Sequence, residues 1–97
     1  MMEPPDYIDD AKVIKWSWSG ETPFGIIENI GEDEITEVFG LAICRYGDSS
    51  NFYRFSCDKN WQIVQDSYCD SIEKAIEFLP GQYKNVERIW MTKEKRQ

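Results

Sequence analysis

Alternation of apolar and polar positions predicts a β-strand near the start of the chain, and a second strand is predicted to follow it. Residues 11–19 place Trp16 and Trp18 on one face of an extended segment, with polar side chains on the other. A period of two is typical of a half-buried strand. A turn signal at residues 20–23 then separates this segment from a second predicted strand at residues 24–30.

The middle of the chain predicts three antiparallel strands in succession. Residues 38–46 are nearly all apolar, a pattern shared by strands buried on both faces and by short buried helices. Their β-branched and aromatic content favours a strand. The turn cluster at residues 47–51 predicts a hairpin to a strand at residues 52–57. A further turn at residues 58–60 leads to a short strand at residues 61–65, which completes a meander.

One amphipathic helix is predicted from Asp70 onwards. Asp70 or Ser71 can cap its N-terminus, and Glu73 resembles the acidic residue of a capping box. Pro80 and Gly81 end the helix. Its apolar stripe consists of Ile72, Ala75, Ile76 and Leu79. Because a helix this short is marginal in isolation, it must pack on the sheet.

The two ends of the chain are predicted to lie outside the folded unit. Pro4 and Pro5 cannot enter a ladder or a helix interior, so residues 1–10 are expected to form a flexible leader. Residues 86–91 alternate weakly and indicate an edge strand or an irregular segment, and residues 93–97 form a solvated tail. The predicted fold is one α+β domain over residues 11–92, a single antiparallel meander of about five strands packed by one helix in the C-terminal half.

The charge balance bears on which partners are compatible with the chain. Its 97 residues carry 11 Lys and Arg against 18 Asp and Glu, a net charge of −7. Nucleic-acid phosphates and anionic membrane surfaces should repel such a protein, whereas a basic protein partner would be attracted. The alternative is that the acidity only maintains solubility. No apolar run approaches the roughly 20 residues of a membrane helix, and the N-terminus lacks the features of a signal peptide, so a cytoplasmic location is expected.

No familiar catalytic or cofactor-binding pattern is present in the sequence. Histidine, the commonest general base and metal ligand, does not occur. Cys44, Cys57 and Cys69 have no CxxC spacing and no flanking cluster of basic residues, so they are predicted to be buried structural residues. The glycines form no phosphate-binding loop. We therefore expect a protein that is not an enzyme and has no catalytic residues, cofactor or metal.

An acidic cluster is the densest concentration of charge and the candidate partner-binding site. It consists of Glu28, Glu32, Asp33, Glu34 and Glu37. Its spacing does not match a calcium-binding loop. Two interpretations remain, a solvated loop between strands or a surface that presents carboxylates to a basic partner, with arginine as the natural counterpart.

The segment FYRFSCDKNW, followed by a short strand and DSYCDSIEKA, resembles small bacterial immunity-type proteins encoded beside polymorphic or contact-dependent toxins. The resemblance lies mainly within residues 52–75. It rests on Phe55, Cys57, Asp58, Trp61, Asp66, Ser71, Ile72, Glu73 and Ala75, with Trp90 in addition. It implies a compact α+β unit that neutralises a toxin by binding it, and it transfers no contact residues.

The sequence thus favours a non-enzymatic acidic binding protein, in its most concrete form an immunity-type inhibitor that occludes a basic toxin or nuclease. The first alternative is a structural or regulatory subunit that binds through an apolar patch or a sheet edge. The second is a small domain with no link to toxins.

Overall fold

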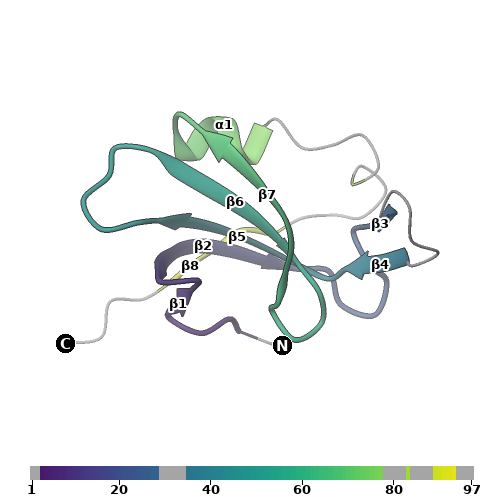
Figure 1. Cartoon of the computed structure of the whole chain (residues 1–97). Coiled ribbons are helices and arrows are strands. Elements are labelled where there is room, and N and C mark those ends of the chain that lie inside the picture. Colours follow the sequence, from purple (N-terminus) through teal and green to yellow (C-terminus); the bar gives the residue numbers. More distant parts are fainter. Residues whose placement is uncertain (1–2, 29–34, 78–82, 84–88, 94–97) are drawn as a thin grey trace.

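A curved antiparallel sheet forms the body of the computed structural model, which describes residues 3–28, 35–77, 83 and 89–93 (Figure 1). The strand order is β1-β2-β5-β6-β7, and β8 pairs with β2. The strands are β1 (Tyr7–Ile8), β2 (Ala11–Trp18), β5 (Gly40–Arg45), β6 (Phe52–Cys57), β7 (Ile63–Cys69) and β8 (Met91–Thr92). Two further strands, β3 (Gly25–Glu28) and β4 (Ile35–Val38), form a separate hairpin. The described residues contain no helix long and apolar enough to cross a membrane.

The predicted meander is confirmed in β5, β6 and β7, which are consecutive antiparallel neighbours. Residues 40–44 of β5 are all buried. The uninterrupted apolar run predicted a strand that is covered on both faces in this way. The hairpin between β5 and β6 turns at the predicted cluster, where the Ser49 N–H donates to the Tyr46 carbonyl at 3.0 Å. Gly47 has φ +52°, a conformation that glycine adopts without strain.

The helix α1 (Ile72–Glu77) covers one face of this sheet. Ser71 caps it, because the Ser71 hydroxyl accepts a hydrogen bond from the Lys74 N–H at 3.1 Å. Ala75 is buried against Ile43 and Cys69, so the expected packing of helix on sheet is confirmed. The predicted end of the helix at Pro80 and Gly81 lies outside the described residues.

The opposite face of the sheet carries an aromatic core. Trp16 is 3% exposed, and its ring meets that of Trp61 edge to face with centroids 6.2 Å apart. Trp18 is partly buried beside the same Trp61 ring. The two tryptophans of the first predicted strand therefore belong to the core. The described part of the fold is mainly β with one short helix.

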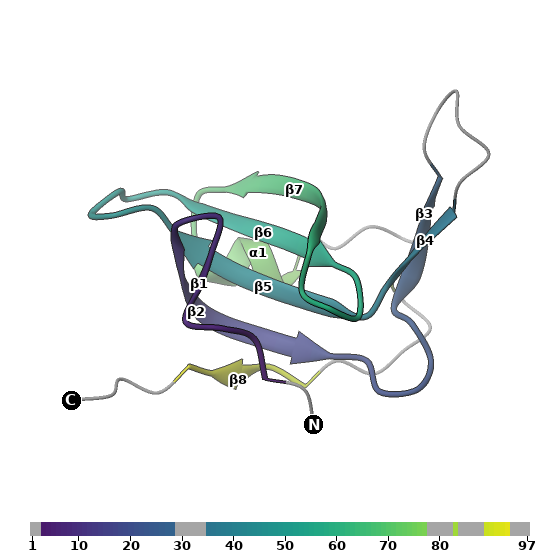
Figure 2. The same ribbon diagram turned by 60° about the horizontal axis from the view of Figure 1, so that its bottom comes forward.

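The prediction of a single sheet is wrong, because β3 does not join the main sheet. It pairs with β4, and the hairpin extends away from the curved sheet (Figure 2). Residues 35–37, predicted as a loop, belong to β4, and the apolar run from 38 to 46 divides at Phe39. Both β2 and β6 end beside Gly40, at Trp18 and Cys57, so residues before Phe39 have no neighbours in the main sheet.

The predicted leader also differs from the structure. Tyr7–Ile8 forms β1 and pairs with β2, and Ile8 is only 6% exposed. Asp9 and Asp10 form the turn between these strands with positive φ angles of 50° and 62°, which aspartate tolerates better than most residues. At the other end, the predicted tail begins with a side chain that is held in place. The Lys93 ammonium lies 2.7 Å from a Glu3 carboxylate oxygen and is 8% exposed; residues 94–97 lie outside the described part.

The last strand of the meander begins later and runs further than predicted. Trp61, expected in a strand at residues 61–65, lies in a turn with φ +61°, and β7 extends from Ile63 to Cys69. β7 forms the outer edge of the main sheet, and no described strand pairs with its far side. Of the weakly alternating segment at residues 86–91, Met91 belongs to β8, opposite Trp16, and residues 84–88 are not described.

Candidate functional site

The β3–β4 hairpin presents an exposed face on which acidic and apolar side chains alternate. Ile26 lies directly opposite Glu37, and Glu28 lies directly opposite Ile35. Because opposed residues of an antiparallel pair project from the same face, these four side chains lie together. All four are exposed, Ile26 by 43% and Ile35 by 60%. We call these four residues the hairpin face.

The other side of the hairpin anchors it to the body of the protein. Val38 is fully buried and packs with Phe24, Leu41 and Tyr83. Ile27 adds partly buried apolar area to the same cluster. The Phe24 N–H also donates to the Val38 carbonyl at 2.7 Å. The hairpin face is therefore held outwards by a buried cluster behind it.

The structure brings together two of the five acidic residues proposed from the sequence. Glu28 and Glu37 share the hairpin face, whereas Glu32, Asp33 and Glu34 lie outside the described residues. The two isoleucines were not included in the predicted site. No alternation of residue type in GIIE or ITEV identifies them. Only the register of the hairpin, with its alternating burial, places Ile26 and Ile35 on the exposed face.

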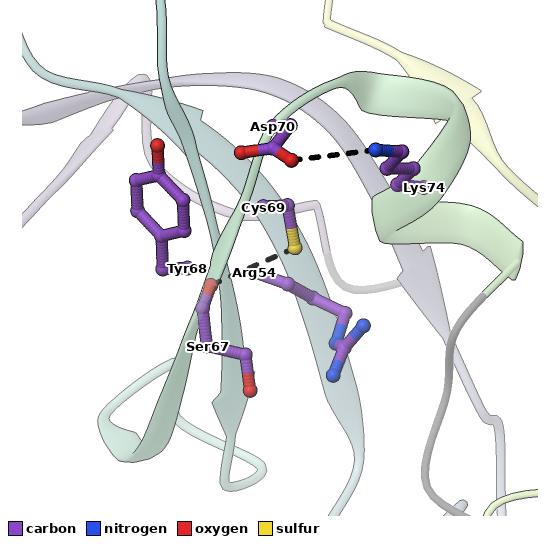
Figure 3. Close-up of a pocket in the computed structure, with 6 residues that line it drawn as sticks. All are labelled: Arg54, Ser67, Tyr68, Cys69, Asp70 and Lys74. Carbon is purple, nitrogen blue, oxygen red and sulfur yellow. Dashed lines mark hydrogen bonds and ion pairs between the residues drawn. The ribbon is translucent and has the colours of Figure 1, made fainter.

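A pocket of about 360 Å³ lies between β6, β7 and α1 (Figure 3). Arg54 is 5% exposed in its wall, and its Nη1 donates to the Ala75 carbonyl at 3.1 Å. Burial lowers the pKa of the Arg54 guanidinium. The Lys74 ammonium lies 3.3 Å from an Asp70 carboxylate oxygen at the start of the helix. The hydrogen bond from Arg54 to Ala75 attaches α1 to the sheet, so we assign this pocket a structural role.

Cys44 and Cys57, two of the three cysteines, are poor nucleophiles. All three are free and buried. Burial raises the pKa of the Cys44 thiol to about 12. The pKa of the Cys57 thiol is also raised to about 12, mainly by burial and further by the nearby Cys44 and Asp58. The unfolded chain releases these protons near pH 8.5, about the ordinary thiol value. Stability is therefore fully present below that pH and is lost as the pH rises towards 12, because only the unfolded state has released the protons.

Thiol labelling of the native protein at pH 8 is expected to modify Cys69 first and to leave Cys44 and Cys57 unmodified. Cys69 lines the pocket of Figure 3 and is 8% exposed, whereas Cys44 and Cys57 are fully buried. Raising the pH to 10 should accelerate labelling of the unfolded chain far more than that of the two core thiols, since their pKa is raised. Peptide mapping after timed alkylation measures each rate.

A denatured sample, in which all three thiols are accessible, provides the control. Labelling of native Cys44 or Cys57 at the rate seen in denaturant would contradict the assignment of these residues to the core.

Tyr46 is a further titratable group with a structural role. Its hydroxyl donates to the Asp9 carboxylate at 2.6 Å, which joins the turn between β1 and β2 to the end of β5. This hydrogen bond is the main cause that raises the pKa of Tyr46 to about 12, with burial second. The phenol therefore remains protonated at neutral pH.

The described residues contain no group of three or more Cys, Asp or Glu side chains placed to hold a metal ion. Comparisons of the chain with models of protein families, with curated proteins and with solved structures found no match.

Proposed function

We propose that this protein is a non-enzymatic acidic binding protein whose hairpin face contacts a basic protein, as an immunity-type inhibitor would when it occludes a basic toxin or nuclease. The observation that carries the proposal is the alternation of Glu28 and Glu37 with the exposed Ile26 and Ile35. The resemblance of residues 52–75 to immunity-type proteins gives the proposal its concrete form.

The chemistry of the hairpin face fits a basic protein surface. The two isoleucines offer apolar area that gains free energy when a partner covers it. The two carboxylates can accept paired hydrogen bonds from arginine, which fixes orientation as well as adding affinity. The net charge of −7 would accelerate the encounter at low salt and disfavour nucleic acids and anionic membranes as partners.

The remaining parts of the proposal follow from the same interpretation. The protein acts in the cytoplasm as one α+β unit, without a cofactor. Glu32, Asp33 and Glu34, which lie outside the described residues, belong to the same proposed set of partner-binding carboxylates.

Replacing both hairpin carboxylates, Glu28→Gln with Glu37→Gln, is expected to weaken partner binding about tenfold for each carboxylate. Each change removes a charged hydrogen bond at the proposed interface. The measurement is capture of partners from a lysate of the source cells at low and at high salt, with mass spectrometry, followed by titration of the captured basic protein. The double change Asp10→Asn with Asp48→Asn is the control, since it removes two exposed carboxylates elsewhere in the structure.

The results separate the proposal from its alternative. A basic partner lost with the hairpin variant and retained with the control supports it. Equal binding by both variants, or no basic partner at low salt, refutes it. The exposure of Ile26 and Ile35 supports the second candidate, an interaction subunit with an apolar contact. In that case Ile26→Ser with Ile35→Ser abolishes binding, while added salt and the carboxylate changes have little effect.

A further inference from the structure

A second pocket, of about 490 Å³, lies at the Arg45 end of β5, opposite the end that adjoins the β3–β4 hairpin. Its volume falls within the range of small-molecule sites, about 300–1,000 Å³. The side chains that matter for its chemistry come from β2, β5, β6, α1 and the segment after β8. They are Lys12, Ile14, Arg45, Phe52, Ile72 and Lys93. We call it the cationic pocket.

Two like charges face each other in this pocket. Lys12 on β2 lies directly opposite Arg45 on β5. Like charges in directly opposed positions of a sheet are destabilising. Within residues 3–28, 35–77, 83 and 89–93, neither side chain forms an ion pair or a hydrogen bond. Among the described residues, two cations without an ion-pair partner thus lie opposite each other, although the chain carries a net charge of −7.

The third cation of the pocket is already compensated. The Lys93 ammonium lies 2.7 Å from Glu3 and 3.3 Å from Asp6, and it donates to the Pro4 carbonyl at 2.6 Å. Its role is to hold the N-terminal segment against the sheet. Lys12 and Arg45 are therefore the groups available to an anion.

The remainder of the pocket is apolar. Phe52 and Ile72 are partly buried and pack on the cluster formed by Ile43, Cys69 and Ala75. Ile14 is also partly buried and lines the same pocket. A ligand seated here would meet two positive charges and partly exposed hydrocarbon.

We infer that the cationic pocket binds a small amphipathic carboxylate. The carboxylate lies between the Lys12 ammonium and the Arg45 guanidinium, whose planar geometry suits two parallel hydrogen bonds to carboxylate oxygens. The aliphatic part of the ligand covers Ile14, Phe52 and Ile72. Such a ligand relieves the repulsion between the two cations and removes apolar surface from water. The inference goes beyond the proposed function and does not depend on it.

Titration with decanoate, below the concentration at which it forms micelles, tests the inference. Decanoate is expected to shift the NMR signals of Phe52 and Ile72, and the variant Lys12→Gln with Arg45→Gln should bind it at least about tenfold more weakly. The control Lys59→Gln with Lys74→Gln makes the same change in net charge at two exposed sites and should retain the affinity. Decanol, which has the chain without the charge, should bind weakly, and decyl phosphate shows whether the site prefers carboxylate to phosphate.

The stability of the ligand-free variant gives an independent readout. If the role of Lys12 and Arg45 is to bind an anion, the variant that lacks both charges should melt at a temperature equal to or above that of the original protein. The reason is that the repulsion between these two cations is removed. A lower melting temperature would assign the two residues a structural role and overturn the inference. The inference would also be overturned if the protein did not bind decanoate, or if both variants bound decanoate with equal affinity. Binding of decanol as tight as that of decanoate, or tighter binding of decyl phosphate than of decanoate, would overturn it as well.

Discussion

Replacing Trp61 with alanine is expected to lower the free energy of unfolding by about 3–5 kcal/mol. Trp61 is 7% exposed, and its ring contacts Trp16 and Trp18 with centroid separations of 6.2 and 5.6 Å. Removing it leaves a cavity in the aromatic core and deletes both ring contacts. Denaturant unfolding followed by far-UV circular dichroism measures the loss, since a signal from tryptophan fluorescence would change with the substitution itself.

Gly40 offers a sharper test of the same contact. A Cβ atom at Gly40 would lie 2.5–2.9 Å from three carbon atoms of the Trp61 ring, closer than carbon atoms approach in folded proteins. Gly40→Ala alone should therefore destabilise the protein by roughly 1–3 kcal/mol through overpacking. In the background of Trp61→Leu the same substitution should cost much less, because the ring is absent. An equal cost in both backgrounds would show that Gly40 and Trp61 do not depend on each other.

The second large effect is expected at the N-terminus. Ile8→Ala should destabilise the protein by about 2–4 kcal/mol, because Ile8 is 6% exposed and packs in the aromatic core with Ala11 and Val13. The neighbouring Tyr7 lies in the same strand but is 60% exposed. Tyr7→Ala should therefore change the stability by less than about 0.5 kcal/mol. Unfolding curves of the two variants, recorded under identical conditions, give the comparison.

The pair also tests whether β1 belongs to the folded unit. A flexible leader over residues 1–10 would make both substitutions neutral. A cost at Ile8 alone would instead place the boundary of the domain before β1.

The sequence pattern predicts most of the strands, but it predicts the pairing of only those in the meander. Tight turns at residues 47–51 and 58–60 join neighbours along the chain, so the order of β5, β6 and β7 follows directly. The apolar segment at residues 24–28 indicates a strand, yet it says nothing about which strand will be its partner. Tyr7 and Ile8 are a short pair among prolines and acids, too little to indicate a strand until Ala11 is known to lie opposite Ile8.

The two candidate sites differ in how far the sequence indicates them. Glu28 and Glu37 belong to a visible acidic cluster, although only the register of the hairpin places Ile26 and Ile35 beside them. The cationic pocket has no local signal, because Lys12 and Arg45 are far apart in the sequence and ordinary in their surroundings. Only the pairing of β2 with β5 brings them together. Sites of this kind depend on tertiary register and escape analysis of local patterns.

The open edge of β7 bears on how the protein behaves at high concentration. Exposed strand edges are templates for pairing with other chains, the usual beginning of aggregation. Asp66 occupies the central position of Ile63–Cys69 and is exposed. Antiparallel pairing of two copies about that centre would place one Asp66 directly opposite the other, and two carboxylates so placed repel each other. Asp66 thus disfavours self-association through the longest open edge of the described sheet. A strand with a positive charge at the matching position could still pair with this edge.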